Sequence, residues 1–174
     1  MSQLETYVGN GSREIFVAST QAGVATSTAL STTQTGITLT NPAGSGKTLV
    51  LLQLRGAVSV APAGASPLVL AANVNPIAAA VTQTTPLTVR PANLGLTKTG
   101  AGLAASAVTL PAAPVVVRSV QGPVAASSVT PAAVSDDING ALSVSPGCAI
   151  SLSSLTTAVT GVWSIVWEEV AEIS

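Results

Sequence analysis

Prolines and glycines interrupt this chain at short intervals along almost its whole length, and they limit what it can fold into. The 174 residues include 11 prolines and 15 glycines, spread between short apolar runs. No segment shows the apolar stripe with a period of 3.6 residues that an amphipathic helix requires. Short strands with turn residues about every 8–12 positions are typical of sandwiches and barrels. The sequence therefore predicts an all-β fold.

The strands are predicted from short runs that are rich in β-branched residues, several of which alternate apolar and polar side chains. They cover 37–40, 48–60, 67–74, 86–90, 115–120, 141–145, 148–153 and 162–170. Turns are predicted at 41–47 and 136–140, where Asn, Asp, Pro and Gly cluster.

Two of these strands carry enough apolar residues for their buried faces to be predicted. In 162–170, the inward face is expected to hold Trp163, Ile165 and Trp167. In 48–60, it is expected to hold Val50, Leu52, Leu54, Val58 and Val60. Gly56 lies within that second strand, where a glycine marks a bulge or a close contact.

Residues 1–18 are interpreted as an N-terminal arm, and 19–174 as a β-sandwich domain. The arm holds Tyr7 and Phe16, two of the four aromatic residues. Because aromatic side chains anchor interfaces out of proportion to their number, both are candidate interface residues for a neighbouring subunit. The alternative is that Phe16 belongs to the first strand of the core.

Few charges are available to keep the surface of this protein soluble. Charged residues make up 7% of the chain, and the net charge is −1. We therefore expect apolar surface to be covered by other copies of the chain. The cations form no basic run, so nucleic acid is not an expected partner. The chain has a positive mean hydropathy of +0.59, but its uncharged stretch 56–89 is broken by prolines, so no membrane span is expected. The N-terminus has no pattern of a signal peptide.

Side chains that support catalysis or metal binding are scarce. The chain has no histidine, and Cys148 is its only cysteine, which is expected to be buried. We therefore expect no catalytic residue, no cofactor and no metal site. One alternative is a calcium site made by Asp136, Asp137 and Asn139, whose oxygens suit that ion. Glu168 and Glu169 are adjacent on a predicted strand, so they point to opposite faces.

A glycine-rich loop invites comparison with the phosphate loop of nucleotide-binding proteins. Gly46, Lys47 and Thr48 match the end of the pattern G-x-x-x-x-G-K-[ST], but the first glycine is replaced by Asn41. A phosphate loop must also open a helix, and an apolar, strand-like run follows here. A hairpin turn is the favoured interpretation, and a nucleotide-binding protein is the alternative.

Three segments carry a resemblance to a known class. Residues 35–52 read TGITLTNPAGSGKTLVLL, 142–152 read LSVSPGCAISL, and 161–170 read GVWSIVWEEV. The first resembles a pair of strands in phage virion proteins, and the other two resemble their final hairpin. On these segments the chain resembles the capsid decoration, or cement, proteins of tailed bacteriophages.

The resemblance implies an antiparallel, jelly-roll-like β-sandwich that forms a homotrimer. It also implies a structural protein of the virion, without enzymatic activity, that binds the major capsid protein on the capsid surface after synthesis in the host cytoplasm. Similar sandwiches occur in tail, fibre and adaptor proteins of virions, which remain the alternative.

Overall fold

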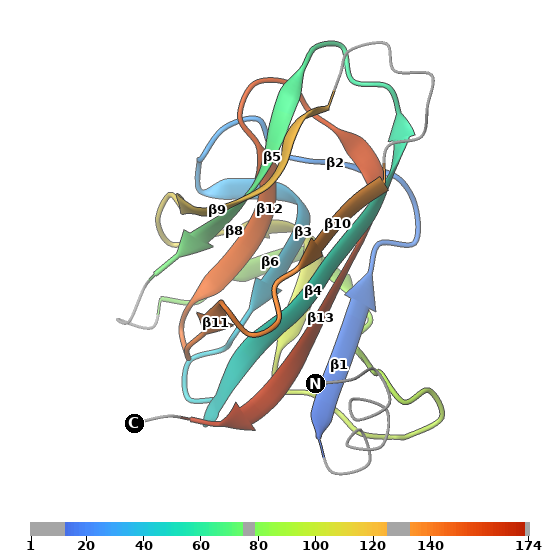
Figure 1. The fold of residues 1–174 in the computed structure, drawn as a ribbon. Coiled ribbons are helices and arrows are strands. Elements are labelled where there is room, and N and C mark those ends of the chain that lie inside the picture. Colours follow the sequence, from blue (N-terminus) through green and yellow to red (C-terminus); the bar gives the residue numbers. More distant parts are fainter. Residues whose placement is uncertain (1–12, 75–78, 125–132, 173–174) are drawn as a thin grey trace.

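The computed structural model describes residues 13–74, 79–124 and 133–172, and within these ranges every regular element is a β-strand (Figure 1). The strands are β1 Glu14–Ser19, β2 Val24–Ala25, β3 Thr33–Thr40, β4 Lys47–Val60, β5 Ser66–Asn73, β6 Thr82–Leu87, β7 Arg90–Pro91, β8 Leu103–Thr109, β9 Val115–Val124, β10 Ala133–Asp137, β11 Ser143–Val144, β12 Ala149–Ser154 and β13 Thr160–Ala171.

The strands form two antiparallel sheets that pack face to face, which confirms the predicted all-β sandwich. The seven-stranded sheet has the order β10-β4-β13-β1-β7, with β11 added to β4 and β2 added to β13. The six-stranded sheet has the order β6-β8-β3-β12-β5-β9. The chain crosses from the six-stranded to the seven-stranded sheet between β3 and β4, and again between β12 and β13. The two expected hairpins are therefore wrong, because both connections join different sheets.

The core between the sheets is built around β13, whose predicted inward face is confirmed. Trp163, Ile165 and Trp167 are each at most 1% exposed. The ring of Phe16 on β1 stacks on Trp167 with centroids 6.1 Å apart. The indole N–H of Trp163 donates to the carbonyl of Val24 at 2.8 Å, so the buried polar group is satisfied.

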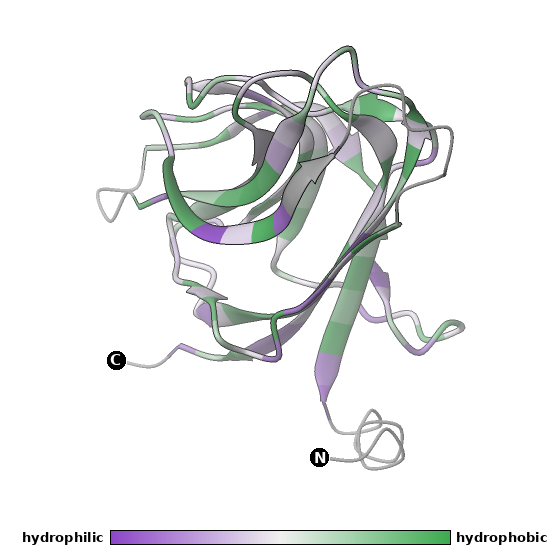
Figure 2. Ribbon diagram, turned by 45° about the horizontal axis from the view of Figure 1, so that its top comes forward, coloured by the Kyte–Doolittle hydropathy of each residue, from purple (hydrophilic) through white to green (hydrophobic). Residues whose placement is uncertain are grey.

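The N-terminal boundary of the sandwich differs from the prediction. Strand β1 begins at Glu14 and pairs with β13 along its whole length, so residues 14–18 belong to the sandwich and not to an arm. Figure 2 shows β1 as a largely hydrophobic strand with a hydrophilic beginning. Phe16 is 1% exposed, so the alternative that places it in the core is correct. Tyr7 lies outside the described residues.

The predicted face of β4 is wrong at its end, where Val60 is 58% exposed after a register shift, and in its first half, where the strand contains a bulge. Trp167 pairs with Leu51 and Val166 pairs with Gln53, so Leu52 is an extra residue on β4. Leu49 and Leu51 are consequently fully buried, whereas Val50 and Leu52 are only half-buried. The alternation of apolar and polar residues in the sequence does not reveal such a bulge, which changes the set of residues that face the core.

The predicted turn at 136–140 begins later than expected. Asp136 and Asp137 end strand β10, and the turn itself uses Asn139 and Gly140, both with positive φ. The Asp136 carboxylate is buried and accepts two hydrogen bonds from Arg118 on β9, at 2.7 and 2.8 Å. This bond raises the pKa of Arg118. The pair joins β9 at the edge of one sheet to β10 at the edge of the other.

Gly56 marks a close contact between strands, as its position on β4 suggested. A Cβ atom at this residue would lie 2.3 Å from the ring of Trp163. The indole of Trp163 on the paired strand β13 therefore occupies the space that the Cβ atom of any other residue at position 56 would need.

The variant Gly56→Ala tests this contact. It should lower the free energy of unfolding by about 1–3 kcal/mol, the range for overpacking a core, because the Trp163 ring has to move. Chemical denaturation followed by tryptophan fluorescence measures the change. The neighbouring Ala57 is exposed, so Ala57→Val serves as the control and should stay within about 0.5 kcal/mol. Equal stability of both variants would contradict the packing described.

Candidate functional site

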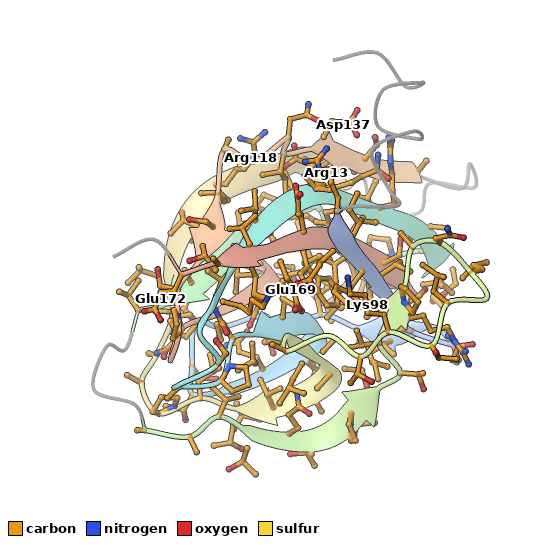
Figure 3. All side chains as sticks on the ribbon, turned by 90° about the horizontal axis from the view of Figure 1, so that it is seen from below. Arg13, Lys98, Arg118, Asp137, Glu169 and Glu172 are labelled. Carbon is orange, nitrogen blue, oxygen red and sulfur yellow. The ribbon has the colours of Figure 1, made fainter. Side chains whose placement is uncertain are left out.

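One end of the sandwich gathers nearly half of the chain's few charged side chains. Strand β1 starts there, β4 starts there and β13 ends there, and the pairing sets Glu14 opposite Glu169 and Lys47 opposite Ala171. Figure 3 views this end from below, with Glu169 near its centre and Lys98 beside it. The residues gathered here are Arg13, Glu14, Lys47, Lys98, Glu168 and Glu169.

Glu169 is a buried carboxylate that accepts hydrogen bonds from a crossing loop. Its side chain receives the backbone N–H of Ala101 at 2.9 Å and of Gly102 at 2.8 Å, and the indole N–H of Trp167 at 3.1 Å. The residue is 5% exposed. Hydrogen bonds to an ionised group are stronger than neutral ones, so Glu169 holds the end of the β7–β8 loop against the core.

Glycines allow this loop to approach the core closely. A Cβ atom at Gly100 would lie 2.8 Å from the Glu169 carboxylate, and one at Gly102 would lie 2.9 Å from the Trp167 indole nitrogen. The other end of the loop is tied by a hydrogen bond from Ala92 N to Ile15 O at 2.8 Å. We call residues 92–102 the anchored loop, because both its ends are bonded to the sandwich.

A second set of contacts holds the middle of the anchored loop. Lys98 lies 3.0 Å from the Glu14 carboxylate, which also accepts a hydrogen bond from Lys47 at 2.7 Å. The hydrogen bonds from Lys47 and Lys98 lower the pKa of Glu14, and the bond to Glu14 raises the pKa of Lys47. Next to them, Glu168 pairs with Arg13 and raises the pKa of Arg13.

The tip of the anchored loop carries exposed leucines. Gly95 has a φ of +104°, which favours glycine, and Leu96 N donates to Asn93 O at 3.3 Å to close a turn. Leu94 and Leu96 on either side are 74% and 49% exposed. An apolar tip on a loop that is held at both ends suits binding to another protein surface.

A further apolar surface lies on the edge strand β9. Val115, Val116 and Val117 are 59%, 43% and 41% exposed. Among the described strands, β9 pairs only with β5, so its other side presents unpaired backbone groups. Such an edge is a template for another strand unless a partner covers it.

The residues that suggested a nucleotide site do not form one. Lys47 starts strand β4 and its ammonium group binds Glu14, so the helix that a phosphate loop requires is replaced by a strand. The turn before it is closed on itself, since the Asn41 amide donates to Lys47 O at 2.7 Å and to Val144 O at 2.8 Å.

The residues that suggested a calcium site also point to other partners. Asp136 binds Arg118, while Asp137 binds Arg55 at 2.9 Å and Gln53 at 2.8 Å. Within the described ranges, no three acidic, cysteine or histidine residues lie close enough together to hold a metal ion. Cys148 is half-buried and packs against the main core.

The anchored loop has no clear signal in the sequence. The predicted strand 86–90 is replaced by the end of β6 and the start of β7. The segment 91–102 after it has no regular alternation, and nothing in it indicates which residue would hold it. One signal was present in the two leucines on either side of Gly95, since apolar residues are unusual in a turn. The burial of Glu169 had no signal, because it depends on a loop that is distant in sequence.

Comparisons with protein-family models, with curated proteins and with solved structures give no match. In the described part of the chain, no helix has the length and hydropathy that crossing a bilayer requires. The function of this end of the sandwich is therefore argued from its geometry alone. Its main feature is the anchored loop, which is held in place and has an apolar tip.

The variant Glu169→Gln tests the anchor. The amide nitrogen that replaces one oxygen would face a backbone N–H, so unfolding free energy should fall by about 1–3 kcal/mol, the cost of a buried unsatisfied group. The Ala101 and Gly102 amides should also exchange hydrogen faster. Asp137→Asn, which removes an exposed ion pair, is the control and should cost at most about 1 kcal/mol. Unchanged exchange at Ala101 and Gly102 would contradict the anchor.

A pH series tests the ion pairs of Glu14. Because its pKa is lowered in the folded protein, they stabilise the fold above the ordinary value of 4.5, and this contribution is lost as the pH falls through the folded pKa. Unfolding free energy should therefore decrease below about pH 4.5, and Glu14→Gln should remove part of that decrease. Denaturation of both proteins between about pH 6 and 3 measures it. Parallel pH profiles would contradict the assignment.

Proposed function

We propose that this chain is a structural virion protein that decorates the head shell of a tailed bacteriophage and stabilises it. It would act as a homotrimer and bind the major capsid protein. The observation that carries the proposal is a β-sandwich whose exposed apolar side chains include those of β9 and of the anchored loop. A protein with 7% charged residues gains solubility when such surfaces are covered by partners.

The segments that resemble decoration proteins form central strands of the two sheets, although they do not form the two hairpins that the resemblance implied. Residues 35–52 form most of β3, the turn and the first half of β4, and 161–170 form most of β13. Strands β4 and β13 pair over their shared length in the middle of the seven-stranded sheet. The resemblance therefore concerns the framework of the sandwich and leaves the binding surfaces to be tested.

We assign contact with the shell to the edge of β9. Three consecutive valines with unpaired backbone groups suit the addition of an extended segment of the shell protein, with main-chain hydrogen bonds for affinity. Arg118 at the next position is held by Asp136, so no free charge opposes that contact.

Binding to undecorated heads tests this function. Purified protein, added to heads assembled without it, should bind saturably, in a copy number that matches the lattice of the shell. Quantitative mass spectrometry of sedimented heads measures the number. Failure to bind heads, together with a few copies in purified tails, would reject the decoration function in favour of a tail, fibre or adaptor protein.

Two matched variants test the surface. Val115→Lys should weaken binding to heads at least about tenfold, the effect of losing a central contact. Val60→Lys changes a valine of nearly equal exposure, 58% against 59%, at the end of β4. It should bind as the unmodified protein does, and equal weakening by both variants would remove the assignment to β9.

A further inference from the structure

Among the described residues, the ion pairs leave one cation without a carboxylate partner. Of the six cations, five pair with carboxylates of the same chain, namely Arg13, Lys47, Arg55, Lys98 and Arg118. Arg90, the sixth, is exposed on β7 and has no ion pair. It lies two residues before the anchored loop, so a free positive charge accompanies the exposed Leu94 and Leu96.

An exposed carboxylate without an ion pair lies elsewhere in the described part of the chain. Within the described part of the chain, Glu172 is the exposed carboxylate that has no ion pair. Its backbone N–H donates to Gly46 O at 3.1 Å, so it lies against the turn between β3 and β4. That turn presents Pro42, Ala43 and Gly44, which are small and uncharged, with Ala43 and Gly44 exposed.

Arg90 lies on β7, at the edge of the seven-stranded sheet beside β1, whereas Glu172 follows β13 and lies against the turn before β4. Figure 3 shows Glu172 on one side and Lys98, with the anchored loop, on the other, and Figure 1 shows the loop and the C-terminal end of β13 on opposite sides as well. Arg90 and Glu172 therefore do not pair within one copy. They can pair between copies when the loop flank of one copy faces the Glu172 flank of the next.

We propose that the anchored loop binds a second copy of this chain, with Arg90 pairing with Glu172 of that copy and Leu94 and Leu96 packing on its turn 42–46. Because the two surfaces lie on opposite flanks, the contact is head-to-tail, and such contacts build rings when the rotation closes. This inference rests on one part of the proposed function, namely that several copies of the protein assemble. The contact proposed here is the one that joins those copies.

Charge reversal tests the pairing. Arg90→Glu and Glu172→Arg, each alone, should weaken self-association at least about tenfold, because like charges then face each other across the contact. The double variant Arg90→Glu/Glu172→Arg should restore association, since it recreates the pair with its signs exchanged. Sedimentation velocity over a concentration series measures each constant, and far-ultraviolet circular dichroism checks that each variant is folded.

The control is Arg55→Glu, which reverses another exposed arginine whose partner Asp137 lies in the same chain. It should leave self-association unchanged. Unaltered association of both single variants, failure of the double variant to recover, or a monomeric unmodified protein would each overturn the proposal. Leu94→Ser/Leu96→Ser should also weaken association. If that variant instead associates normally and loses binding to heads, the loop contacts the shell and the proposal is wrong, while the decoration function stands.

Discussion

The structure depends on the two tryptophans of β13, because each needs an apolar surrounding and an acceptor for its indole N–H. Trp163 donates to Val24 O and Trp167 donates to Glu169, so each indole ring packs in the core while its N–H is hydrogen-bonded. The same side chains dictate where glycine must stand on neighbouring segments, at Gly56 and Gly102. One strand thus sets the core, the spacing of its neighbours and the path of the anchored loop.

Most charged side chains of the described residues are used for contacts within the chain, and this bears on the proposed association with partners. Most carboxylates and cations pair with each other and hold segments of the chain together. Examples are the Arg118–Asp136 pair between the sheet edges and the Lys98–Glu14 pair on the loop. Few charges remain to make the exterior repel other proteins. Specificity at a contact between such surfaces then depends on a small number of unpaired charges, since apolar contact alone discriminates poorly between partners.

The sequence predicted the fold class and the strands with clear alternation, and β13 shows why. Its buried face is continuous, so a period of two is visible in Trp163, Ile165 and Trp167. Prediction failed where a local pattern depends on distant residues. The bulge at Leu52 exists only against β13, the strand at Asp136 forms by pairing with β4, and β8 is a run of small residues whose burial comes from its neighbours. The anchored loop belongs to the same group, because its anchor lies 67 positions away from Gly102.

The central position of β13 has a consequence for how the chain folds during synthesis. Strands β1 and β4 both pair with β13, one on each side, and β13 is the last of the described strands to leave the ribosome. The seven-stranded sheet therefore cannot close until about residue 171 has been made, and until then β1 and β4 have unpaired edges. Contacts between residues so far apart in sequence make folding slow, so these unpaired edges are exposed to aggregation while the chain is being made.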